Sequence, residues 1–188
     1  EILEGIIRLN EKGAGLSWCN PNGVRVESLD ADLIRLIKRS NCAELVVGVE
    51  HLEPGVLNAM NKQLDVEKAR EIIGKLVRSG IPRVTLFLIV GYPGETRARF
   101  ERNRKLLKEL FRMSGVLSVC VNIAQPYPGT RLLARCRSEG YIRDKNFDNF
   151  LVRRDLMETE HTVSIITPDF SVWDVFYRRN ILIADSGH

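Results

Sequence analysis

The residues best suited to chemistry stand directly after apolar runs. The clearest example is Gly91-Tyr92-Pro93-Gly94-Glu95, which follows the apolar run 84–90 and precedes a helical pattern. Because Gly91 and Gly94 lack a Cβ atom, a flat or charged ligand can come close to this backbone. The alternative is a plain strand-to-helix turn with Glu95 near the helix N-terminus.

A second candidate is Glu50, which ends an otherwise apolar strand. The alternation of a strand puts Val46, Gly48 and Glu50 on one face. A carboxylate in the mouth of a barrel is costly to bury unless it is paired. Glu50 therefore either faces a ligand or lies at a solvated strand end, where Arg25 or Arg83 could pair with it.

Amides and an aromatic ring occur at the other strand ends. Asn20 follows the first predicted strand and Asn122 interrupts the fourth, so both could present an amide to a ligand. The alternative is an amide bonded to neighbouring backbone. Tyr127 stands between two prolines in the loop that begins at Gln125, and stacking on a proline is its ordinary interpretation. His51 could donate a proton, although a single loop histidine is more often exposed.

Periodicity predicts an alternating chain that would position these residues. Strands are expected at 14–20, 44–50, 83–90 and 116–124, with residues 21–23 as a loop. Helices are expected at 1–12, 55–61, 96–113 and 131–139. Two more are expected directly after the N-caps Asp30 and Asp65, and a last helix begins at Pro168. Gly80 is a helix stop. Apolar strands that alternate with helices predict an α/β fold, with a parallel sheet covered by helices. In such sheets the loops after the carboxyl ends of the strands carry the chemistry.

Composition narrows the class of protein. The chain has 188 residues, 44% hydrophobic and 28% charged, with a formal charge of +4, so it carries no strong nucleic-acid signal. It lacks an apolar run long enough to span a membrane. None of the four cysteines lies within four residues of another, which excludes a local metal knuckle or a CxxC pair. Without a secretory signal, a reduced cytoplasmic protein is expected.

Four segments in register resemble the radical S-adenosylmethionine (radical SAM) superfamily, in the branch that often carries an upstream cobalamin-binding domain. They are NPNGVRVESLDADLIRLIKRSNC (20–42), VVGVE (46–50), FLIVGYPGET (87–96) and QPYPGTRLL (125–133). The likeness covers roughly residues 1–143. Each segment alone is a weak signal, and their order and spacing together make a strong one.

The resemblance implies a partial TIM-like (β/α) barrel with parallel strands and helices outside. It implies reductive cleavage of S-adenosylmethionine to a 5′-deoxyadenosyl radical. In the family, the 91–95 loop and its strand lie beside the adenine, and the residue at Glu50 faces the ribose or the methionine amino group. The segment around Tyr127 closes over the adenine. The implied cofactor-binding residues are Asn20, Glu50, Gly91, Pro93, Gly94, Glu95, Asn122, Gln125 and Tyr127. The family more often has Ser and Gly after this Glu, where His51 and Leu52 stand here.

The defining CxxxCxxC motif of the superfamily, whose thiolates hold a four-iron four-sulfur cluster, is absent from this sequence. The chain therefore resembles the carboxyl-terminal two thirds of the catalytic barrel, with 1–188 as one domain and 144–188 as a helical extension. The parent protein is expected to use S-adenosylmethionine and the cluster, with cobalamin as a further cofactor of that branch. This chain alone is expected to be inactive and to bind none of them, so no metal ligand or catalytic residue is predicted.

Two other interpretations stay open. The chain could be a non-catalytic α/β module that binds a nucleoside-like ligand or a protein partner. It could also be an unrelated barrel enzyme in which Glu50 and Glu95 form an acid–base pair. A barrel without its first strands exposes the edge of strand 14–20, which predicts self-association or a terminal helix over that edge. The small-molecule substrate cannot be inferred from the sequence.

Overall fold

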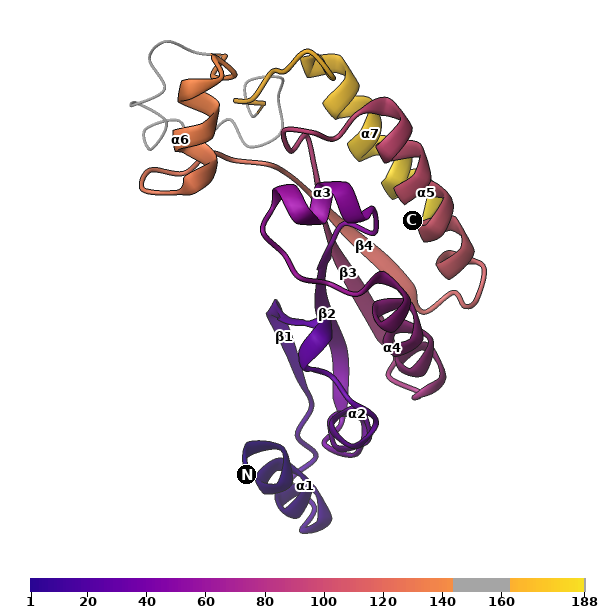
Figure 1. Cartoon of the computed structure of the whole chain (residues 1–188). Helices are drawn as coiled ribbons and strands as arrows, with labels where there is room; N and C mark the ends of the chain where they lie inside the picture. Colours follow the sequence, from indigo (N-terminus) through magenta and orange to yellow (C-terminus); the bar gives the residue numbers. More distant parts are fainter. Residues whose placement is uncertain (144–162, 188) are drawn as a thin grey trace.

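The computed structural model describes residues 1–143 and 163–187. Its centre is a four-stranded parallel sheet in the order β1-β2-β3-β4 (Figure 1). The strands are β1 (Trp18–Arg25), β2 (Cys42–Glu50), β3 (Arg83–Val90) and β4 (Leu117–Ile123). The predicted α/β class with parallel strands and outer helices is confirmed, because each strand pairs in parallel with its neighbour in sequence.

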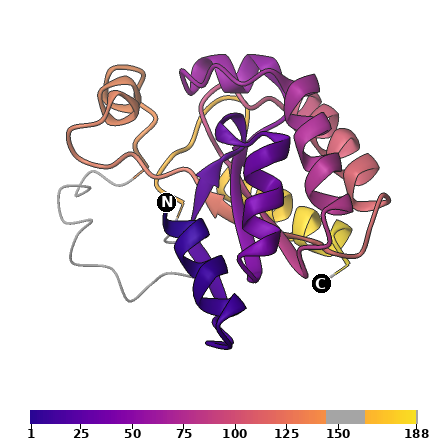
Figure 2. The same ribbon diagram turned by 90° about the horizontal axis from the view of Figure 1, so that it is seen from below.

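Helices connect and cover the strands. They are α1 (Ile2–Glu11), η1 (Val26–Ser28), α2 (Ala31–Arg39), α3 (Pro54–Ala59), α4 (Val66–Arg78), α5 (Arg97–Phe111), α6 (Arg131–Ser138) and α7 (Val172–Asp185). Figure 2 shows α2, α4, α5 and α7 on the same side of the sheet. Asp30 and Asp65 accept hydrogen bonds from the backbone N–H groups of Leu33 and Lys68, which confirms both predicted N-caps. Gly80, at φ +78°, follows α4 as predicted.

The two faces of the sheet differ sharply in burial. The outer face, under the helices, carries leucines and valines such as Val47, Leu86 and Leu88 that are fully buried. Burial of each such side chain stabilises the fold by roughly 1.5–3 kcal/mol. The alternate residues point to the inner face, where Ile89 pairs with Asn122 and both keep exposed surface. The inner face is therefore the side of the sheet open to a ligand.

The first strand runs further than the sequence predicts. A strand at 14–20 with a loop at 21–23 is wrong, because β1 begins at Trp18 and continues to Arg25. The side chain of Asn20 makes this possible: its Oδ1 accepts from Val46 N at 2.8 Å and its Nδ2 donates to Val46 O at 3.2 Å. The side-chain amide of Asn20 thus makes the two hydrogen bonds that a backbone peptide group would make in a regular ladder, at the point where the register shifts between Asn20 and Val24.

Helix α7 also differs from its predicted start. It begins at Val172 rather than at Pro168, because Ser171 and Asp174 form a reciprocal capping box. It packs beside α5 and β4 (Figure 1), and Asp185 near its end binds Arg104 of α5. The predicted extension 144–188 is thus described from residue 163 to residue 187. Its first part, 144–162, lies outside the described residues.

Candidate functional site at the strand exits

The carboxyl ends of parallel strands share one edge, and most predicted site residues lie there. Glu50 pairs with Leu88, Ile89 pairs with Asn122, and Ala124 N donates to Val90 O at 2.9 Å. Glu50, the 91–95 loop, Asn122 and the loop that starts at Gln125 therefore follow adjacent strands at the same level. Asn20 does not join them, because it pairs with Leu45, well before β2 ends.

Glu50 lies folded over the inner face of the sheet. Its backbone has φ +65°, and its Oε1 would be 2.9 Å from a Cβ atom placed on Gly48. Lys62 Nζ donates to Glu50 Oε1 at 3.1 Å and to Gly48 O at 3.2 Å. The Glu50 side chain keeps 26% of its surface exposed. Lys62 therefore neutralises the carboxylate without enclosing it.

The sequence suggested different partners for Glu50, and these were wrong. Arg25 binds Glu27 at 3.0 Å, and Arg83 lies 3.7 Å from Glu44. Lys62 was missed because it lies in the irregular stretch after α3, where periodicity carries no information. Only the fold brings it back to the end of β2.

Glu95, by contrast, is completely buried. Its Oε2 accepts from Gly91 N at 2.7 Å and from Arg178 Nη1 at 3.0 Å. Its Oε1 lies 3.2 Å from His51 Nε2. A carboxylate with three such partners and no exposed surface fixes the conformation of the 91–95 loop. This placement does not support an acid–base pair with Glu50.

His51 is buried too, so the expectation of an exposed loop histidine was wrong. Its Nδ1 accepts from Glu53 N at 3.0 Å. Nδ1 therefore carries no proton, and Nε2–H is the group that donates to Glu95. His51 thus links the exits of β2 and β3 and does not face solvent as a proton donor.

The glycines of the 91–95 loop are required by backbone conformation. Gly91 has φ +75° and Gly94 has φ +96°, a region that side-chain-bearing residues rarely adopt. A Cβ atom on Gly91 would meet Val175 Cγ2 of α7 at 3.1 Å. The sequence suggested that a ligand could approach Gly91 on this side. That expectation is wrong for Gly91, because Val175 of α7 fills the space. Pro93 is buried, and its carbonyl accepts from Arg135 Nη1 at 3.4 Å.

The remaining predicted residues lie at the exit of β4. Asn122 is exposed on the inner face. Gln125 Oε1 accepts from Ser164 Oγ at 3.1 Å, so the segment after residue 162 reaches this exit. Tyr127 is 54% exposed, and its carbonyl accepts from Thr130 Oγ1 at 2.6 Å. Direct ligand contact by these residues, and by the other predicted site residues, stays a prediction.

Metal-binding groups are not assembled in the part of the chain that the structure describes. No group of three or more His, Cys, Asp or Glu residues there could hold an ion. Cys19, Cys42, Cys120 and Cys136 are free thiols. Burial raises the pKa of Cys42 and of Cys136 to about 11, which keeps both thiols protonated near neutral pH. None of these cysteines joins a group of three metal-binding residues in the described part of the chain, so they do not fit an iron–sulfur cluster.

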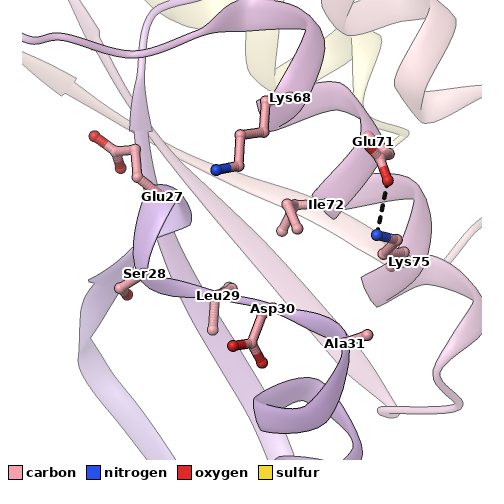
Figure 3. Close-up of a pocket in the computed structure, with 9 residues that line it drawn as sticks. All are labelled: Glu27, Ser28, Leu29, Asp30, Ala31, Lys68, Glu71, Ile72 and Lys75. Carbon is pink, nitrogen blue, oxygen red and sulfur yellow. Dashed lines mark ion pairs between the residues drawn. The ribbon is translucent and has the colours of Figure 1, made fainter.

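A separate hollow of about 370 Å³ lies between η1, the start of α2 and α4 (Figure 3). It is lined by Glu27, Ser28, Leu29, Asp30, Ala31, Lys68, Glu71, Ile72 and Lys75. Lys75 and Glu71 pair with each other at 2.7 Å. None of the predicted site residues lines this hollow, so it is distinct from the strand exits.

The model of the Radical SAM superfamily matches residues 2–107, more than half of the chain. The chain therefore belongs to the radical SAM superfamily, as its sequence segments indicated. The match includes β1 to β3 and the 91–95 loop, and it ends within α5.

Two curated relatives are similar to this chain in sequence, and a solved structure is similar in fold. An uncharacterized methyltransferase of Pyrococcus horikoshii is 24% identical over 158 residues, which cover 84% of this chain and 33% of the relative. The ribosomal protein uS12 methylthiotransferase RimO of Geotalea uraniireducens is 29% identical over 175 residues, which cover 87% of this chain and 38% of the relative. The chain thus spans about a third of these relatives. The radical S-adenosylmethionine methyltransferase TsrM from Kitasatospora setae matches the fold with a TM-score of 0.65 and 16% identity, covering 96% of this chain and 39% of TsrM.

Proposed function

We propose that this chain forms the nucleoside side of an S-adenosylmethionine site in a radical SAM enzyme. The observation that carries the proposal is the open inner face at the strand exits. There the partly exposed Ile89 lies between the carboxylate of Glu50 and the amide of Asn122. An adenosyl group needs an apolar surface for its base and acceptors for its ribose hydroxyls, and this edge supplies both.

The residues present fit the nucleoside. A partly exposed carboxylate can accept hydrogen bonds from vicinal hydroxyls, and Lys62 holds that of Glu50 in one place. Ile89 and the half-buried Phe87 offer apolar contact, and Tyr127 is exposed enough to stack on a base. In the parent enzyme, S-adenosylmethionine would supply the group that is cleaved reductively.

The cysteines do not fit the four-iron four-sulfur cluster, because their spacing lacks CxxxCxxC and none of them joins a group of three metal-binding residues among the described residues. We therefore assign no step of the reaction to residues of this chain at a cluster. The parent protein would provide the CxxxCxxC motif elsewhere, and this chain by itself is expected to be inactive. Cobalamin as a further cofactor stays a proposal that the likeness to TsrM favours, because another structure of TsrM has cobalamin bound.

Binding of S-adenosylhomocysteine, measured by calorimetry, tests the nucleoside site. We expect Glu50→Gln to weaken binding to the parent protein by about tenfold or more, because one charged hydrogen bond contributes about 1.5–3 kcal/mol and about 1.4 kcal/mol is tenfold. Glu44→Gln is the matched control, since Glu44 lies at the other end of β2 and binds Thr85. Equal affinity in the wild type and in both variants would contradict the proposed site.

The enzymatic part of the proposal has a separate test. The parent protein, reconstituted anaerobically with iron and sulfide and then reduced, should release 5′-deoxyadenosine from S-adenosylmethionine. If the cluster forms and no 5′-deoxyadenosine appears, the enzyme assignment is wrong. The alternative, a non-catalytic module for a nucleoside-like ligand or a protein partner, would then be favoured if nucleoside binding persists.

Two further proposals concern the setting of the chain. Within the described residues β1 pairs only with β2, and helix α1 packs on α2. We propose self-association through this strand edge, which light scattering would detect.

No helix in the described part of the chain is long and apolar enough to cross a membrane. A cytoplasmic location stays a prediction.

A further inference from the structure

Arg178 of α7 reaches into the exit of β3 from outside the sheet. Its Nη1 donates to the backbone O of Glu95 at 2.6 Å and to Glu95 Oε2 at 3.0 Å. Its Nη2 donates to Asp169 O at 3.3 Å. The guanidinium lies 5.4 Å from the centre of the Phe100 ring and 5.3 Å from that of Phe170. The side chain is 4% exposed, so it is held on every side by protein.

Glu95 connects Arg178 to the backbone of the 91–95 loop. The oxygen that binds Arg178, Oε2, also accepts from Gly91 N. The other oxygen is bound to His51, which belongs to the exit of β2. Val175, on the same helix as Arg178, contacts Gly91 from the side where a Cβ atom would be. Helix α7 therefore holds the end of β3 at two points.

The energetics favour one conformation of this network. A buried carboxylate is tolerated only when it is paired and fully hydrogen-bonded. Every partner of Glu95 is itself buried: Arg178, His51 and the N–H group of Gly91. If the guanidinium is removed, the buried Glu95 loses its compensating cation and two of its hydrogen bonds. The 91–95 loop must then change conformation or admit water.

We propose that Arg178 is a positioning residue for the nucleoside site. It acts through the carboxylate of Glu95 to set the conformation of the 91–95 loop. Its effect on ligand binding rests on the proposed function, because it requires that this edge bind a nucleoside. Arg178 lies outside the family match, which ends at residue 107. The carboxyl-terminal segment thus completes a loop that belongs to the family region.

The test compares two arginines that both hold α7. Arg178→Met removes the contact with the loop. Arg104→Met removes the pair with Asp185, which fastens α7 to α5 without touching the loop. Both are made in the parent protein, and amide hydrogen exchange of residues 88–96 is followed together with affinity for S-adenosylhomocysteine. We expect Arg178→Met to speed exchange at Gly91 and to weaken binding by about tenfold or more, within the usual range of coupling between sites.

Arg104→Met should change both quantities less than about twofold, although it loosens α7. Arg178→Lys keeps the charge but not the forked contacts, so its affinity should lie between wild type and Arg178→Met; it decides the matter if Arg178→Met does not fold. Equal effects of the Arg178 and Arg104 variants, or unchanged exchange at Gly91, would overturn the proposal. If the wild type binds no S-adenosylhomocysteine, the proposed function fails, and the exchange data alone decide the role of Arg178 in the loop.

Discussion

The exits of β2 and β3 each carry a glutamate, and the two side chains have opposite environments. Glu50 keeps part of its surface exposed on the inner face and pairs with one cation, Lys62. Glu95 has no exposed surface and binds an arginine, a histidine and a backbone N–H group. In sequence both are acids that follow an apolar strand.

The difference shows two uses of a carboxylate at a strand exit. Glu50 has lone pairs left for a ligand, because Lys62 donates to its Oε1 at 3.1 Å while part of the carboxylate stays exposed to solvent. Glu95 has its donors within the protein, so it shapes the backbone. Mutations that separate stability from ligand binding should therefore distinguish the two exits.

The largest effect is expected for Glu95→Ala. This change leaves the buried Arg178 without its counter-charge, and removal of one partner from a buried pair costs about 3–5 kcal/mol of unfolding free energy. Urea denaturation at neutral pH measures it. Glu50→Ala, the matched control at the other exit, should cost less than about 1 kcal/mol. Similar losses in the two variants would abolish the distinction between the exits.

Gly91→Ala should have the next largest effect. An alanine at φ +75° is strained, and its Cβ atom would also press on Val175. Together these should lower the unfolding free energy by about 1–3 kcal/mol. Gly115→Ala is the control, because no atom lies within 4 Å of a Cβ placed there. A Gly91→Ala protein as stable as the control would show that the loop is not held in this conformation.

The pair of Asp185 and Arg104, which joins α7 to α5, predicts a smaller, pH-dependent effect. The hydrogen bond from Arg104 lowers the pKa of Asp185 below its ordinary value of 3.8. The stabilisation is therefore present above that value and is lost as the pH falls through the lowered pKa. Asp185→Asn should cost no more than about 1 kcal/mol near neutral pH, and the difference from wild type should shrink in acid. A difference in unfolding free energy that stays constant down to acid pH would contradict this.

The smallest change in stability is expected for Glu50→Gln. Glutamine keeps the size of the side chain, and the lost pair with Lys62 is partly exposed, so the unfolding free energy should change by less than about 1 kcal/mol. The same variant should nevertheless weaken nucleoside binding, as proposed above. If it lost stability without losing affinity, Glu50 would be a structural residue like Glu95.

Much of the fold could be predicted because its signals are local. Alternating apolar strands and helical periods gave β2, β3 and β4 nearly to their ends, and the side chains of Asp30 and Asp65 cap helices within three residues of themselves. Four segments in register indicated the family. None of these inferences needed to know which residues distant in sequence come into contact.

The site could be predicted only in part, because its chemistry depends on partners far apart in the chain. Glu95 and Arg178 are 83 positions apart, and His51 and Glu95 are 44 apart. The placement of Asn20 in the ladder with Val46 likewise required the register of β1 against β2. No local pattern encodes such contacts.

The sequence by itself determined the order of strands and helices, the parallel sheet and the edge at which polar residues gather, since periodicity and helix caps act over a few residues. Only the tertiary structure decided which of two similar glutamates is buried and which stays available. That choice depends on where α7 and Lys62 pack, and on the cost of burying a charge without a partner.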